Sequence, residues 1–139
     1  TSGFLGSRLT DEDLDNIDLF LLDVKSGLPD TYENVTARQL QPTIDFGDRL
    51  HEKGKPVWIR FVVVPGLTDS EDNVQAVADI VARWKGTVER VEVLPFHNMG
   101  EDKWNRIGMD YELKGVSPPT PESVEHVREV FRSRGLTVF

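Results

Sequence analysis

The sequence predicts an α/β fold with parallel strands. Three runs rich in β-branched and other apolar residues, at 18–24, 56–64 and 88–94, alternate with longer stretches of helical periodicity. Mostly apolar runs such as the one at 18–24 are typical of strands in parallel sheets that are covered on both faces. Strand and helix in alternation imply right-handed crossover connections between neighbouring strands.

Each predicted strand has a clear boundary. The run at 18–24 (DLFLLDV) lies between charged residues, the run at 56–64 (PVWIRFVVV) ends at Pro65-Gly66, and the run at 88–94 (VERVEVL) ends at Pro95. A short fourth run at 136–139 closes the chain. About four strands do not close a barrel, so either further strands are missing or the sheet is small and open. The apolar open edge favours missing strands.

The helical stretches also carry boundary signals. The acidic segment at 10–15 reads as the capped, solvated start of a helix, and a second helix is expected over 37–53, kinked or broken at Pro42. Thr68 or Asp69 can cap the next helix, and Pro121 opens the last one at a first-turn position.

Composition limits the classes of function. The 139 residues suffice for one domain over 1–139, and the net charge of −8 opposes a nucleic-acid surface. No apolar run is long enough to span a membrane, and the cytosol is the default compartment. The sequence has no cysteine, which excludes disulfides and thiolate-ligated metals or clusters within it. Because the first residue is Thr, we expect a processed, trimmed or cut form of a longer protein.

Polar residues at the predicted strand ends are the candidates for chemistry. Asp23 and Lys25 lie two apart, so their side chains share one face at the carboxyl end of a strand, where parallel sheets bind ligands. A carboxylate and an ammonium there can hold the two ends of a zwitterion such as an amino-acid moiety. The alternative is a structural ion pair.

Two further residues belong to the same predicted rim. Arg60 interrupts an apolar strand and needs an acidic partner, such as Asp23, or a polar ligand. His97 follows the third strand and can exchange a proton, contact a ligand or have no role. The chain has no phosphate-binding glycine loop and no nucleophile elbow. The residues thus indicate a site for a small zwitterionic ligand.

Three blocks resemble the glycyl-radical activating enzymes of the radical S-adenosylmethionine (SAM) superfamily. They are DLFLLDVK at 18–25, VWIRFVVVPGLTD at 57–69 and VERVEVLPFHNMGEDKW at 88–104, in the family's order and spacing. The tail YELKGVSPP at 111–119 and the opening TSGF fit as well. This resemblance covers nearly the whole chain.

The resemblance implies the C-terminal half of a partial (β/α)6 barrel. The family reduces SAM at a 4Fe-4S cluster to methionine and a 5′-deoxyadenosyl radical, which abstracts hydrogen from a glycine of a partner enzyme. The implied cofactors of the full-length parent are SAM and that cluster. The implied partners are a glycyl-radical enzyme, best guessed as pyruvate formate-lyase, and an electron donor such as flavodoxin.

The resemblance also implies residue roles, none of them catalytic. Asp23 and Lys25 match the pair near the SAM methionyl group, and the other SAM-contacting positions are Arg60, Val62 and His97. A monovalent-cation site would use Thr1, the Leu21 carbonyl and Asp23. The residues expected near the docked partner are Asn98, Met99, Gly100, Lys103 and Trp104.

One departure from the family decides what this chain can do alone. The cluster motif CxxxCxxC is absent, so we expect the isolated chain to be inactive. A second hypothesis is a cluster-free domain that binds a partner protein or SAM without catalysis. A third is an unrelated sugar-phosphate enzyme that uses Lys25 or His97, which the missing phosphate loop weakens.

Overall fold

The computed structural model describes residues 1–139, apart from the side chains of residues 101, 102 and 105. Its strands are β1 (Phe20–Asp23), β2 (Val57–Val63) and β3 (Val88–Pro95). Its α-helices are α1 (Asp11–Asp15), α2 (Pro29–Thr36), α3 (Gln41–Glu52), α4 (Glu71–Ala82), α5 (Glu101–Arg106) and α6 (Pro121–Ser133). Short 3-10 helices span Gly6–Arg8 and Asn98–Gly100.

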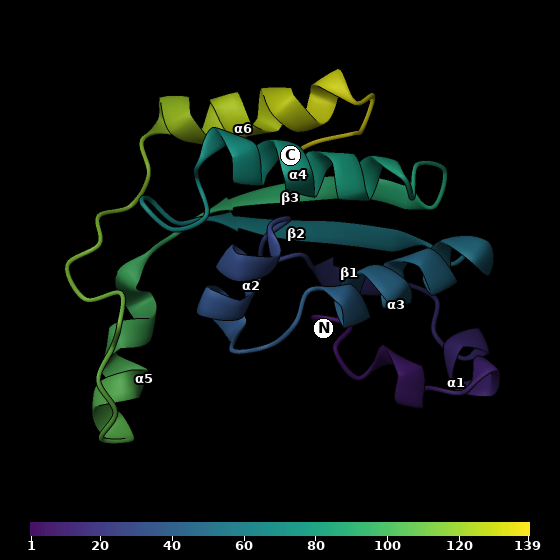
Figure 1. The fold of residues 1–139 in the computed structure, drawn as a ribbon, viewed down its shortest axis with the longest axis horizontal. Coiled ribbons are helices and arrows are strands. Elements are labelled where there is room, and N and C mark those ends of the chain that lie inside the picture. Colours follow the sequence, from purple (N-terminus) through teal and green to yellow (C-terminus); the bar gives the residue numbers. More distant parts are fainter.

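The three strands form one parallel sheet in the order β1-β2-β3, which confirms the predicted α/β class. Helices α2 and α3 connect β1 to β2, and α4 connects β2 to β3. Figure 1 shows α3, α4 and α6 together on one side of the sheet. The sheet therefore has one covered face and one face without helices among the described residues. The expectation that β1 is covered on both faces is not met by these residues, because Leu21 on the open face is 37% exposed.

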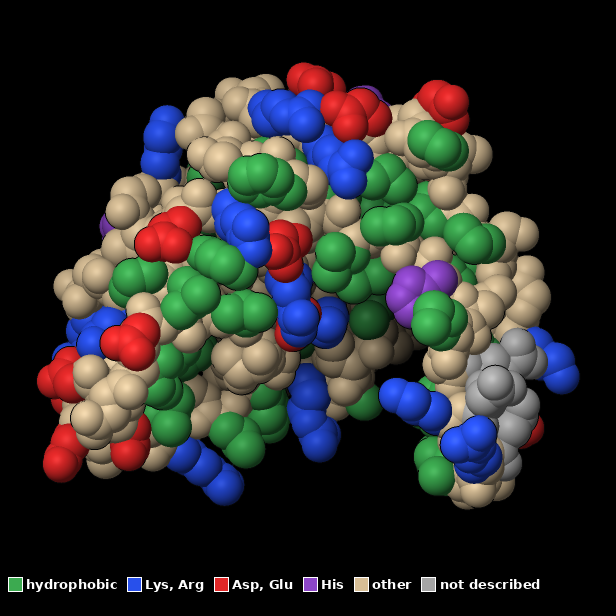
Figure 2. Space-filling view, turned by 180° about the vertical axis from the view of Figure 1, so that it is seen from behind, with side chains coloured by type: hydrophobic (Ala, Val, Ile, Leu, Met, Phe, Trp, Pro, Cys, Tyr) green, Lys and Arg blue, Asp and Glu red, His purple; other side chains and the backbone are tan. Residues whose placement is uncertain are grey.

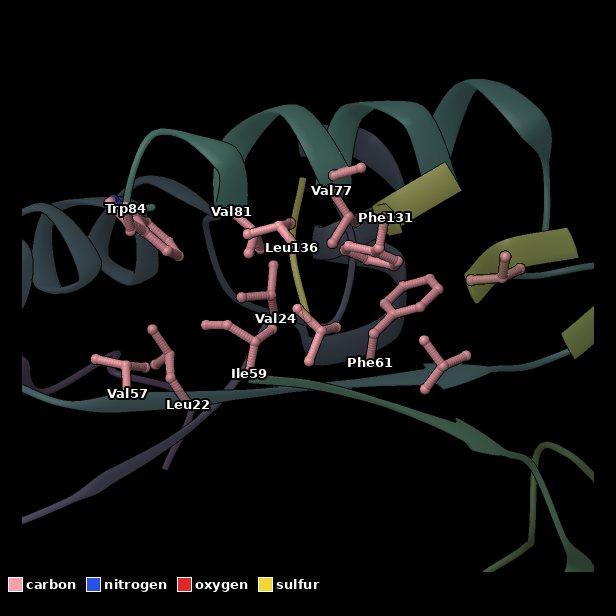
Figure 3. Close-up of a cluster of buried hydrophobic side chains, with 14 of the residues drawn as sticks. Leu22, Val24, Val57, Ile59, Phe61, Val77, Val81, Trp84, Phe131 and Leu136 are labelled. Carbon is pink, nitrogen blue, oxygen red and sulfur yellow. The ribbon is translucent and has the colours of Figure 1, made fainter. Parts of the chain in front are cut away.

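The core lies between the covered face and the helices. Strand β2 alternates, with Val57, Ile59, Phe61 and Val63 buried and the residues between them half-buried. Figure 3 shows the buried strand side chains pointing toward Val77 and Val81 of α4. Phe61 also packs on Phe131 of α6, with their ring centroids 6.0 Å apart. This burial stabilises the sheet from one side only.

The helix expected over 37–53 is shorter in the structure, where α3 spans Gln41–Glu52. Helix α2 lies before this segment and is capped by Ala37, whose φ of 54° is left-handed. The expected kink or break at Pro42 is wrong, because Pro42 occupies the first turn of α3. The amides of a first turn have no partner within the helix, so a proline costs nothing there. Helix α2 was not predicted.

Four other local predictions have different outcomes. The capped helix start at 10–15 is confirmed, because Thr10 and Asp13 form a capping box. Helix α4 begins after Ser70 rather than after a Thr68 or Asp69 cap. The fourth run forms a single parallel bridge, Val91 to Val138, instead of a full strand. Pro121 opens α6 as expected.

No helix of the described part of the chain is both long enough and apolar enough to cross a membrane.

Candidate functional site

The candidate site lies on the sheet face that no described helix covers. Residues of this open face alternate with the core residues along each strand. Figure 2 shows on this face a row of charged side chains, with hydrophobic side chains on either side of the row. Strand pairing places Asp23 opposite Arg60 and Arg60 opposite Glu92. Acidic and basic side chains thus alternate across three neighbouring strands.

Asp23 and Arg60 form the centre of this row of charged side chains. Arg60 donates from Nε to Asp23 Oδ1 at 3.1 Å and from one terminal nitrogen to Oδ2 at 3.0 Å. The carboxylate side chain is 12% exposed and the Arg60 side chain 35%. Burial raises the pKa of Asp23, but the Arg60 hydrogen bonds and the Lys25 charge outweigh it and hold the pKa below its ordinary value. Asp23 is therefore a carboxylate at neutral pH.

Lys25 completes the predicted strand-end group. Its Nζ lies 3.3 Å from Asp23 Oδ1, and its side chain is 34% exposed. The structure thus brings Asp23, Lys25 and Arg60 together and contains the ion pairs that were the alternative reading of each residue. Because Lys25 is half-exposed, its ammonium can also meet a ligand on the open side. An ion pair and a ligand contact are compatible here.

Val62 and His97 lie nearer the same edge. Val62 is half-buried and shares the open face with Arg60, two residues further along β2. His97 is exposed and follows the end of β3 by two residues. The amide of Phe96 donates to the Val63 carbonyl at 3.1 Å, which ties the start of the His97 loop to the end of β2. All five proposed SAM contacts thus come from the carboxyl half of the sheet.

A second charged cluster was missed by the sequence reading. The Arg90 guanidinium lies 3.4 Å from the centroid of the Trp58 ring, and it pairs with Glu92 at 2.8 Å. Trp58 Nε1 donates to Glu89 at 2.8 Å. The signal was present, because residues 90 and 92 interrupt the third run at a spacing of two and so share one face. The cation–π contact between Arg90 and Trp58 stabilises the packing of β2 against β3 at this end of the sheet.

The segment expected near a protein partner follows β3. Met99 is 79% exposed and Trp104 is 36% exposed, with its ring 6.2 Å from that of Tyr111. The Asn98 side chain donates to the Val116 carbonyl at 3.0 Å. This hydrogen bond joins the two ends of the segment 98–116. The apolar surface continues through residues that sequence reasoning missed, Ile107 at 66% and Met109 at 53% exposure. Gly100 is half-buried and Lys103 exposed.

The residues of the expected cation site lie close together. The Thr1 amino group donates to the Leu21 carbonyl at 3.0 Å and lies 3.8 Å from Asp23 Oδ2. Across the described residues, no cluster of three or more His, Asp or Glu side chains could hold a metal ion.

Solved structures define the class to which this fold belongs. A domain of a pyruvate-formate lyase-activating enzyme from Bacteroides vulgatus superposes with a TM-score of 0.74 at 19% identity, covering 94% of this chain and 73% of that one. A radical SAM methyltransferase from Sphaerobacter thermophilus superposes with a TM-score of 0.63 at 16% identity, covering 86% and 32%. The chain shares the parallel α/β fold of these two proteins.

Sequence relatives define the family. The chain is 41% identical to a pyruvate formate-lyase-activating enzyme of Streptococcus mutans over 116 residues, which are 84% of this chain and 44% of the relative. It is 36% identical to a pyruvate formate-lyase 1-activating enzyme of Escherichia coli over 140 residues, 99% and 56%. The chain therefore belongs to the family of pyruvate formate-lyase activating enzymes, and it spans about half the length of these relatives. No protein-family model matches it.

The two cofactors of that family fit this chain differently. The cluster needs thiolate ligands, and the sequence contains no cysteine, so these residues cannot hold it. A zwitterionic ligand such as the methionyl end of SAM needs a carboxylate and an ammonium close together. Asp23 and Lys25 meet that need, with 3.3 Å between their charged atoms.

Proposed function

We propose that this chain is the C-terminal portion of a pyruvate formate-lyase activating enzyme, in which it holds SAM and contacts the partner enzyme. Its residues 1–139 form one part of a partial (β/α)6 barrel domain in the cytoplasm. The observation that carries the proposal is 36% identity over 99% of the chain to such an enzyme. The charged group at the carboxyl edge of the sheet supports it, because parallel sheets bind ligands there.

The proposed SAM site uses the ion pairs of the open face. Arg60 grips both oxygens of Asp23 and so holds the carboxylate in one orientation. Asp23 then faces the ammonium of the methionyl group, and Lys25 faces its carboxylate. Val62 and His97 complete the contacts at the edge. Bound SAM supplies a sulfonium whose reductive cleavage yields the radical, whereas the cluster belongs to a part of the enzyme outside this chain.

The proposed partner site is the apolar surface after β3. Its residues are Asn98, Met99, Gly100, Lys103 and Trp104, and we include Ile107 and Met109 because their side chains are exposed. Large exposed apolar side chains grouped on one segment are typical of protein-binding surfaces. The partner is a glycyl-radical enzyme, pyruvate formate-lyase, and the electron donor of the whole enzyme is a flavodoxin-like protein.

The first experiment extends the chain to the product of its whole reading frame. We expect that product to contain CxxxCxxC, to bind a 4Fe-4S cluster after reconstitution, and to produce a glycyl radical on pyruvate formate-lyase, seen by electron paramagnetic resonance. A frame without cluster cysteines would refute the proposal and favour the cluster-free binding domain. The isolated chain should bind SAM weakly or not at all, and submicromolar binding would contradict this.

A matched pair of variants tests the SAM site. In the whole protein, Lys25→Ala should weaken SAM binding about tenfold or more, because it removes a charge-assisted contact of roughly 1.5–3 kcal/mol. Lys53→Ala is the control, since Lys53 pairs with Asp11 on the covered side at 2.7 Å. Isothermal titration measures both. Equal affinities for the two variants would exclude Lys25 from the site.

A second pair tests the partner surface. Trp104→Ala should weaken the complex with pyruvate formate-lyase about tenfold or more, because exposed tryptophans often dominate interfaces. Phe139→Ala is the control, as an exposed aromatic residue (60%) beyond the partner segment. Surface plasmon resonance measures the affinities. An unchanged affinity for Trp104→Ala would place the partner elsewhere.

A further inference from the structure

A buried asparagine of α4 binds the loop that carries Lys25. Asn73 has no exposed surface, although it lies in the first turn of a helix that begins at Glu71. Its Oδ1 accepts hydrogen bonds from Ser26 Oγ at 2.6 Å and from the Gly27 amide at 2.9 Å. Ser26 and Gly27 directly follow Lys25 in the chain. One side chain therefore holds the backbone next to the proposed ligand-binding lysine.

The same side chain reaches the end of the neighbouring strand. Asn73 Nδ2 donates to the Thr68 carbonyl at 2.7 Å. Thr68 is itself buried, and its hydroxyl donates to the Val62 carbonyl and accepts from the Val64 amide, both at 2.8 Å. Val62 is two residues beyond Arg60 on β2. Asn73 thus joins the loop after β1 to the loop after β2.

Close packing makes this connection rigid. Gly27 lies so near α4 that a Cβ atom added to it would stand 2.4 Å from the Val77 amide nitrogen and 2.5 Å from the Ala76 carbonyl carbon. Both neighbours are backbone atoms, which cannot move aside without deforming the helix. The loop at Ser26 and Gly27 is therefore held against α4 by close packing as well as by hydrogen bonds. Only a residue without a side chain allows this approach.

We propose that Asn73 is a positioning residue, which holds Lys25 in register with Asp23 and Arg60 so that the group binds SAM. This role rests on the proposed function of the site. Lys25 needs such support because its side chain is 34% exposed and its ion pair to Asp23 leaves the backbone of its loop unanchored. The buried Asn73 amide supplies that anchor through its hydrogen bonds to Ser26 and Gly27, and its third bond, to the Thr68 carbonyl, ties the loop to the end of β2.

Hydrogen exchange on this chain tests the connection itself. Asn73→Ala should speed exchange of the Gly27 amide about tenfold or more, while the amides of β2 keep their protection. Ser26→Ala removes only one of the three bonds and should give a smaller change in the same direction. Val81→Ala is the control, because it opens a cavity in the buried face of the same helix away from the loop. Unchanged Gly27 exchange in Asn73→Ala would refute the connection.

SAM titration of the whole protein tests the positioning role. Asn73→Ala should raise the dissociation constant about tenfold, comparably to Lys25→Ala, whereas Val81→Ala should leave it unchanged despite a similar loss of thermal stability. Failure of the unmodified whole protein to bind SAM would refute the proposed function, and the positioning role with it. Normal binding by both the unmodified protein and Asn73→Ala would refute the positioning role alone.

Discussion

The ion pair between Asp23 and Arg60 should contribute measurably to the stability of this chain. The substitution Asp23→Asn keeps the size of the side chain and removes its charge. One carboxylate oxygen becomes an amide nitrogen, so one of the two Arg60 bonds, at 3.0 or 3.1 Å, is replaced by two donors facing each other. Lys25 also loses its partner at 3.3 Å.

The magnitude follows from the burial of the two partners. Breaking a fully buried pair costs about 3–5 kcal/mol, and breaking an exposed pair costs about 0–1 kcal/mol. Asp23 is nearly buried at 12% exposure, but the Arg60 side chain is 35% exposed and regains water when the bond is lost. We therefore expect Asp23→Asn to lower the free energy of unfolding by about 2 kcal/mol.

Urea unfolding followed by tryptophan fluorescence measures this loss at pH 7. With a slope of about 2 kcal/mol per molar, the midpoint should fall by about 1 M. Asp11→Asn is the control, because Asp11 contacts Arg49 at 2.6 Å and Lys53 at 2.7 Å yet is 66% exposed. Its effect should be much smaller and should disappear in high salt. Equal losses for the two variants would refute the burial argument.

Three further predictions concern pH and packing. The lowered pKa of Asp23 means that its stabilisation is present above the unfolded pKa near about 4 and is lost as pH falls through the folded value. The stability difference between the unmodified chain and Asp23→Asn should therefore shrink below about pH 4, and a constant difference would contradict the shift. Gly47→Ala places a Cβ 2.2 Å from the Trp84 ring and should destabilise the chain by about 1–3 kcal/mol, as thermal unfolding would show. Higher stability in that variant would mean that the ring has room to move. Phe131→Ala should cost about 3–5 kcal/mol in urea because Phe131 is fully buried, whereas Phe139→Ala, exposed at 60%, should cost little. Similar costs for the two phenylalanines would place the core elsewhere.

Much of the fold could be predicted from local patterns. The three apolar runs became the three strands, and their boundaries moved by at most two residues. The start of α6 at Pro121 and the capping box of α1 were also predictable, because both depend on backbone groups within the same turn. The kink at Pro42 failed for a related reason. A proline is acceptable or disruptive according to where its helix begins, and periodicity locates that start poorly.

Part of the candidate site could likewise be predicted from the sequence, and part required the tertiary structure. The spacing of Asp23 and Lys25 already placed both on one face at a strand end, and the chemistry of a carboxylate beside an ammonium followed from residue type alone. The sequence also left Arg60 with a choice between an acidic partner and a ligand. Only the register of β1 against β2, which pairs residue 23 with residue 60, settled that Asp23 is the partner.

What the sequence by itself determined is the class of fold and the set of polar residues at the strand ends, because both arise from interactions within a few residues. What only the tertiary structure decided is the network around them. Asn73 reads as an ordinary polar residue early in a helix, and its partners Ser26 and Gly27 lie 47 and 46 residues away. Burial of such a side chain depends on how distant segments pack, and local periodicity carries no information about that packing.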